Sequence, residues 1–101
     1  MGTSIKSAAF MLERYLADAA DGDADALYQL GVAYSTGMGG LDVDLIEAHK
    51  WFNLAALNGS VIGQECRAEI AEEMTAREIA EAQRQARAWL SQTGHTLRRA
   101  A

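Results

Sequence analysis

The chain has 101 residues, a length that suits one compact domain and is too short for two. Its formal net charge of −5 argues against nucleic-acid binding, which requires a basic patch. With one cysteine, the chain can form neither an internal disulfide framework nor a multi-cysteine zinc site. It contains no proline, a residue that breaks helices, so long uninterrupted helices are favoured.

Apolar residues spaced three and four positions apart predict helices along most of the chain. The expected helices cover about residues 4–20, 24–35, 45–58, 61–74 and 76–92. We expect one helical-repeat domain at 1–94 and a disordered tail at 95–101. Asp23, Asp44 and Thr75 are the expected N-caps, because their side-chain oxygens can accept hydrogen bonds from free N–H groups at a helix start.

Two of these helices carry specific packing expectations. Gly31 costs the second helix ~1 kcal/mol relative to alanine, so we expect a neighbouring helix to approach closely at that point. The fourth helix places four apolar residues on one face, which is expected to turn toward the core: Ile62, Cys66, Ile70 and Met74. Free cysteine is among the most buried residue types, so Cys66 is expected to be a buried thiol.

An internal repeat relates the first and third predicted helices. Gly22 and Gly59 lie 37 positions apart, and each follows the end of a predicted helix. At the same offset Tyr15 corresponds to Phe52. A period of about 30 to 40 residues made of two helices is typical of an α-solenoid. Residues after Gly59 no longer match those 37 positions earlier. This loss is expected for a terminal repeat, which must have a polar outer face.

The stretch from residue 22 to residue 59 resembles one full repeat of the Sel-one-like repeat family, a relative of the tetratricopeptide repeats. The resemblance rests on small, aromatic and acidic residues at matching spacings: Ala26, Leu30, Gly31, Tyr34, Gly37, Gly39, Asp44, Ala48, Trp51, Phe52, Ala55, Ala56 and Gly59. It implies an all-α fold, a short right-handed α-solenoid of about five antiparallel helices with one full repeat flanked by partial repeats. It also implies an adaptor that binds other proteins rather than an enzyme.

The same resemblance implies that the first helix of each pair lines a concave face. On the second and fourth predicted helices, the positions left open by the core are mostly acidic, with one aromatic residue. Such a surface suits a basic or mixed peptide segment. The candidate binding face therefore consists of Asp25, Tyr28, Gln29, Val32, Glu65, Glu69 and Glu72. A plain solvated face is an equal alternative for each of these residues.

Self-association is an alternative function. About 1.5 to 2 repeats are fewer than the three or so that a solenoid usually needs for stability. The exposed terminal helices, the first and the fifth, would then pair between two copies and form a structural homodimer.

A small metal-binding or enzymatic domain is the remote alternative. The run DGDAD at 21–25 begins like a calcium loop, but Ala26 and Val32 occupy the positions that require glycine and glutamate. We therefore expect no catalytic residue, no metal and no cofactor. The expected partner is a protein or peptide, not nucleic acid or a membrane. A cytoplasmic location is expected, or a periplasmic or secreted one if a signal peptide has been removed.

Overall fold

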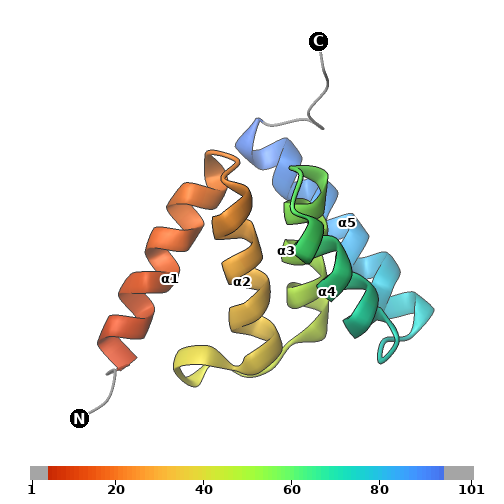
Figure 1. The fold of residues 1–101 in the computed structure, drawn as a ribbon, viewed down its shortest axis with the longest axis horizontal. Helices are drawn as coiled ribbons and strands as arrows, with labels where there is room; N and C mark the ends of the chain where they lie inside the picture. The colour runs from red at the N-terminus through yellow and green to blue at the C-terminus, as the bar shows by residue number, and fades with distance from the viewer. Residues whose placement is uncertain (1–4, 95–101) are drawn as a thin grey trace.

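The computed structural model describes residues 5–94, with side chains from Ala8 onward. Its helices run alternately up and down the molecule (Figure 1). They are α1 (Ile5–Ala20), α2 (Ala24–Thr36), α3 (Leu45–Leu57), α4 (Val61–Ala71) and α5 (Ala76–Thr93), with a short 3-10 helix, η1 (Met38–Gly40), after α2. Residues 5–94 contain no strand. The predicted all-α stack of antiparallel helices is confirmed, and the predicted tail at 95–101 lies outside the described residues.

Side-chain caps start the helices, as the sequence predicts. Asp23 Oδ1 accepts hydrogen bonds from the backbone N–H groups of Asp25 and Ala26 at 2.9 and 3.3 Å. At the start of α5, Thr75 Oγ1 accepts from the Glu78 N–H at 3.1 Å, and Glu78 Oε1 accepts from the Thr75 N–H at 2.8 Å. This reciprocal pair is a complete capping box. The N-caps of α3 and α4 are Asp44 and Ser60, and the side chain of each accepts one backbone hydrogen bond.

The core lies between α2 and α3, where a glycine permits close approach. A Cβ atom at Gly31 would overlap the ring of Phe52 on α3. The expected close approach at Gly31 is therefore confirmed, and the ring occupies the space that a side chain would take. The main core cluster adds aliphatic residues and a tryptophan from α1, α2, α3 and α5: Ala19, Ala26, Leu27, Leu30, Trp51, Leu54, Ala55 and Ala86.

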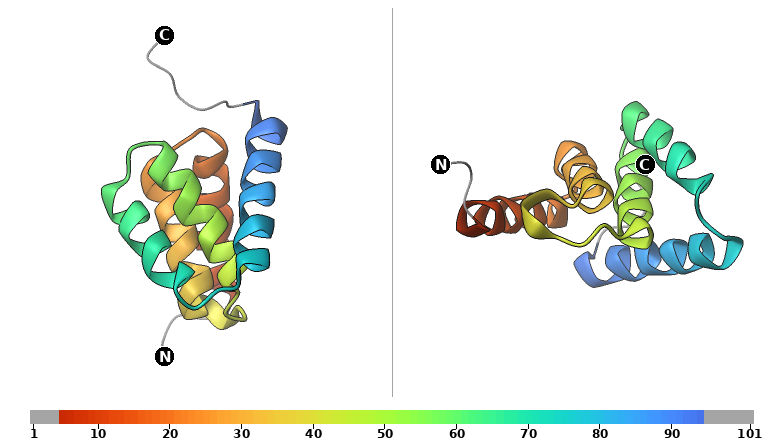
Figure 2. Two further views of the ribbon diagram at one scale, coloured as in Figure 1. Left: turned by 90° about the vertical axis from the view of Figure 1, so that its right-hand side faces the viewer. Right: turned by 90° about the horizontal axis from the view of Figure 1, so that it is seen from below.

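Helix α3 is the central element of the stack. It packs against α2, α4 and α5, whereas α4 and α5 diverge from the turn that joins them (Figure 2). Two buried alanines, Ala82 and Ala86, let α5 approach closely. Next to them, the rings of Trp51 and Trp89 meet edge to face, with centroids 4.8 Å apart and planes at 77°. The last helix is thus attached to α3 rather than to its sequence neighbour.

The predicted core face of α4 is wrong. Half of Ile62 is exposed (50%), Cys66 is only partly buried, and the helix ends at Ala71, so Met74 lies in the following turn. Gly63 is the buried residue of α4. The expected buried thiol at Cys66 is therefore also corrected.

A missing side chain explains the altered face of α4. A Cβ atom at Gly63 would lie 3.0 Å from the Ala55 Cβ atom and 3.2 Å from the Phe52 carbonyl oxygen of α3. The helix therefore turns its glycine toward α3, and its larger apolar residues rotate toward solvent. Glycine has no apolar side chain, so hydrophobic periodicity does not identify it as the contact point.

The helices found in residues 5–94 include none with the length and apolar character needed to span a membrane.

Candidate functional site

The candidate binding face draws on α2 and α4, which contact each other. Its acids Asp25, Glu65, Glu69 and Glu72 are exposed, and its other members, Tyr28, Gln29 and Val32, are half-buried. The Tyr28 hydroxyl and the Cys66 thiol, from the two helices, lie close enough for each to influence the pKa of the other. Cys66, which the sequence assigned to the core, therefore lies in this face.

Electrostatic interactions show which acids surround the Tyr28–Cys66 pair. Burial raises the pKa of the Cys66 thiol, and the charges of Glu69 and Glu65 raise it further. Burial likewise raises the pKa of Tyr28, with smaller contributions from Cys66 and from Asp25. The pair thus has carboxylates on both sides, from α2 and from α4.

Other predicted residues of the face are not joined to this group. Across residues 5–94, no side-chain hydrogen bond or ion pair connects Gln29, Val32 or Glu72 to the Tyr28–Cys66 pair. Glu72 is the C-cap of α4, and the Val32 carbonyl accepts hydrogen bonds from the hydroxyls of Ser35 and Thr36. The structure therefore groups four predicted residues and leaves three at the periphery.

The aromatic residue of the face is anchored on the core. The Tyr28 and Phe52 ring centroids lie 5.8 Å apart with the planes tilted by 41°. Phe52 itself is buried, at 2% exposure. Because its ring packs on a buried neighbour, Tyr28 presents a preorganised aromatic surface.

The glutamates of α4 lack cationic partners. Within residues 5–94, the ion pairs join Glu47 to Lys50 and Glu81 to Arg84, and neither involves α4. Arg67, the basic residue of α4, instead donates from Nη1 to Asn53 Oδ1 on α3 at 2.5 Å. The solvent side of α4 is consequently acidic.

A buried histidine lies between α3 and α4. His49 is 3% exposed, and its Nδ1 has no hydrogen-bond partner in the described part of the chain. Burial lowers the pKa of His49, and the positive charge of Arg67 lowers it further. Both effects favour the neutral form of the imidazole.

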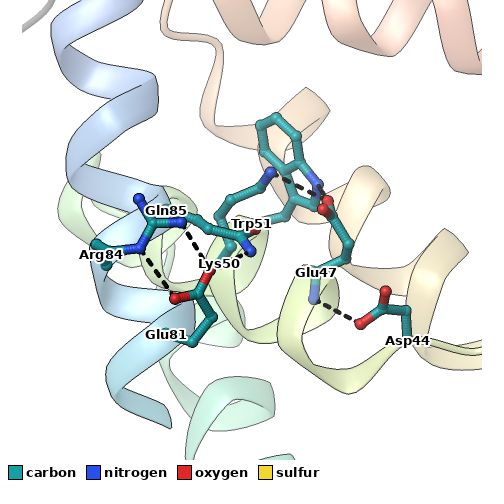
Figure 3. A network of polar contacts seen from close by, with 7 residues as sticks. All are labelled: Asp44, Glu47, Lys50, Trp51, Glu81, Arg84 and Gln85. Carbon is teal, nitrogen blue, oxygen red and sulfur yellow. Dashed lines mark hydrogen bonds and ion pairs between the residues drawn. The ribbon is translucent and has the colours of Figure 1, made fainter. Parts of the chain in front are cut away.

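A polar network with one half within α3 and the other within α5 went unrecognised in the sequence (Figure 3). On α3, Glu47 Oε1 accepts from Trp51 Nε1 at 3.0 Å and pairs with Lys50 Nζ at 3.1 Å. The Lys50 ammonium also lies 4.5 Å from the centroid of the Trp51 ring. The spacing of these residues by three and four positions was the available signal.

The α5 half of the network centres on Glu81. Arg84 donates from Nε and Nη2 to its two carboxylate oxygens at 2.9 and 2.7 Å, and Gln85 Nε2 donates to Oε2 at 2.8 Å (Figure 3). These hydrogen bonds hold the pKa of Glu81 at about 2. The fork-shaped pairing fixes the Arg84 guanidinium in one orientation on the helix surface.

Residues 5–94 contain no group of three or more His, Cys, Asp and Glu side chains that could hold a metal ion.

Comparison with known proteins identifies the repeat. Residues 24–60 match the family model described as Sel1 repeat, a range that spans α2, η1, α3 and the N-cap of α4. No match was found among curated proteins or among solved structures. Repeats of this family are not enzymes and generally mediate protein–protein interactions. The matched range carries the glycine-to-phenylalanine contact described above, and this part of the chain, residues 24–60, is similar to a Sel1 repeat.

Proposed function

We propose that the chain is an interaction module whose candidate binding face holds a basic or mixed segment of a partner protein. The observation that carries the proposal is the group of exposed acids on the contacting helices α2 and α4, near Tyr28 and Cys66: Asp25, Glu65 and Glu69. These carboxylates have no cationic partner within residues 5–94. A partner's lysine or arginine side chains would supply the missing charges.

The charge pattern of α4 supports a cationic partner. Glu65 and Glu69 are four positions apart on α4, and like charges at this spacing destabilise a helix by about 0.2–0.5 kcal/mol per pair. A bound cation relieves this repulsion. Each exposed ion pair contributes only about 0.2–1 kcal/mol, so the charges supply specificity and the anchored Tyr28 ring supplies a contact of the kind that dominates interfaces.

Titration with peptides tests the proposal. Capped peptides with alternating lysine and leucine are expected to bind more tightly than glutamate–leucine peptides of the same length, with an affinity that falls as salt rises. The double variant Glu65→Lys, Glu69→Lys should bind the lysine–leucine peptide with an affinity lower by at least about tenfold. The matched control is Glu13→Lys, an exposed charge reversal on α1. Equal binding of both peptide types, or an unchanged affinity in the double variant, would contradict the proposal.

Self-association through α1 is a second candidate function, favoured by apolar exposure. Phe10 is 60% exposed and Met11 is 42% exposed on a groove of about 210 Å³ that also includes Arg14, Tyr15 and Asp18. Within residues 76–93, α5 exposes no large apolar side chain. The observations thus favour α1 over α5 as the pairing helix.

The mass in solution tests this second function. Size-exclusion chromatography with light scattering across a hundredfold range of concentration should show a dimer that dissociates on dilution. Phe10→Asp should shift it to a monomer. A protein that stays at the 10.9 kDa chain mass throughout would contradict self-association.

A further inference from the structure

A pocket of about 270 Å³ opens between α3 and α5, beside the network of Figure 3. Two cations, two amides, a tryptophan and an alanine line it: Lys50, Arg84, Gln85, Ala88, Trp89 and Gln92. Pockets for small molecules usually measure about 300–1,000 Å³, so this one suits a small ligand. It uses helices other than the α2–α4 pair of the candidate binding face.

The charged groups of the pocket offer hydrogen-bond donors and no free acceptor. Glu47 and Glu81 hold the two cations in place, yet neither glutamate lines the pocket. An arginine has five N–H donors and a lysine has three. Glu81 takes two bonds from Arg84 and Glu47 takes one from Lys50, so both cations keep unused donors. An anionic oxygen, such as that of a carboxylate, complements both these donors and their positive charge.

The rest of the lining favours an apolar ring. Trp89 is fixed by its edge-to-face contact with Trp51, at 4.8 Å between centroids. Ala88 has a small side chain and leaves the adjoining space open. Aromatic rings pair favourably with a tryptophan at centroid distances of about 4.5–7 Å. The cations and the indole thus stand side by side in one pocket.

We propose that this pocket binds a small aromatic carboxylate, with the carboxylate held by Lys50 and Arg84 and the ring packed against Trp89. The Gln85 and Gln92 amides add neutral donors at the rim of the same pocket. Because Arg84 is already oriented by Glu81, it is positioned before the ligand arrives.

Tryptophan fluorescence provides a direct test, because Trp89 lines the pocket and the chain's other tryptophan, Trp51, contacts the Trp89 ring. The probe is N-acetylphenylalanine, which carries a carboxylate and a ring that does not emit in the tryptophan range. We expect a saturable change in emission below about 10 mM. N-acetylphenylalaninamide, which has the ring without the charge, should produce none.

Variants separate charge recognition from general packing. Arg84→Gln should lower the affinity for N-acetylphenylalanine about tenfold, since it removes one charge-assisted contact. Arg87→Gln, on the same helix and outside the pocket lining, is the matched control and should leave the affinity unchanged. Thermal melts by circular dichroism establish that each variant is folded.

Three outcomes would overturn the proposal. They are the absence of saturable binding, equal binding of the uncharged amide, and an Arg84→Gln affinity equal to that of the unaltered chain. A fourth arm separates a free acid from an acidic side chain within a polypeptide, using the doubly capped dipeptide acetyl-Glu-Phe-amide. Tighter binding of that dipeptide would replace the small-molecule ligand with an acidic protein segment and would also overturn the proposal.

Discussion

The α2–α3 hairpin and the α4–α5 pair show how much a repeat depends on its signature residues. In the first, both helices bury several residues and the Phe52 ring fills the space opposite Gly31. In the second, α4 buries Gly63 alone and α5 packs on α3 instead of on α4. All four helices begin with a side-chain N-cap, so the difference lies in side-chain complementarity rather than in the signals that start the helices.

The comparison also explains why the acidic and the cationic sites occupy different helices. Helix α4 lies at the edge of the stack with most of its surface in solvent, which tolerates unpaired glutamates. Helix α5 uses Ala82 and Ala86 to reach α3, and its long polar side chains flank that contact. The departure of α5 from α4 therefore creates a second polar surface that a regular repeat would cover.

The largest expected effect comes from removing the ring at the centre of the first pair. Phe52→Ala should lower the free energy of unfolding by about 3–5 kcal/mol, because Phe52 is 2% exposed and its loss leaves a cavity. Ile62→Ala on α4 is the control, expected to cost less than about 1 kcal/mol since Ile62 is 50% exposed. Urea denaturation measures both, and similar losses would remove the distinction between the two pairs.

Adding a methyl group to each buried glycine sharpens the same contrast. Gly31→Ala should lower stability by about 1–2 kcal/mol, because the overlap with Phe52 outweighs the ~1 kcal/mol gain in helix propensity. Gly63→Ala meets Ala55 Cβ at 3.0 Å, a milder contact, and the two effects should nearly cancel. Denaturation midpoints that rank the two variants in the opposite order would contradict this assignment of the close contacts.

Removing the capping box tests how much the stability of α5 depends on the hydrogen bonds at its N-terminus. Thr75→Ala should cost about 1 kcal/mol, because it removes the acceptor for the Glu78 N–H and half of the reciprocal pair. Ser91→Ala, at an exposed position near the other end of α5, is the control and should be nearly neutral. Thermal melting compares them, and an unchanged midpoint in the Thr75 variant would show that packing on α3 alone holds the helix.

The smallest expected effect is a pH dependence of the α3–α4 contact. The pKa of His49 is lowered from 6.5 in the folded chain, so the unfolded chain binds the proton more readily. The contribution of neutral His49 to the free energy of unfolding is present above pH 6.5 and declines as the pH falls below that value. The loss should be at most about 1 kcal/mol between pH 6.5 and 5.5. His49→Gln should flatten this part of the stability curve, and a slope that persists in the variant would assign it to other groups.

The sequence predicted the local features well because they depend on neighbours in the chain. The caps at Asp23 and Thr75 involve hydrogen bonds over two or three residues, and both are observed. The Sel1-like repeat was equally visible, since its residues occupy characteristic spacings between 24 and 60. The candidate binding face remains a prediction, although Tyr28 and the glutamates of α4 were identified as a group from the sequence.

The errors concern contacts between distant segments. Periodicity placed Ile62 and Cys66 in the core, but the approach of α4 to α3 at Gly63 turned Ile62 outward and brought Cys66 beside Tyr28. The pocket between Lys50 and Arg84 depends on α5 packing against α3 rather than α4, and no single-helix pattern reveals that choice.

The sequence by itself determined the helices, their caps and the repeat, because these follow from hydrogen bonds and spacings within a few residues. Only the tertiary structure decided which face of α4 is buried, where α5 docks and which polar groups meet. Those outcomes depend on which helices can approach most closely, and that is set by small residues such as Gly63, Ala82 and Ala86, whose side chains contribute little hydrophobic signal.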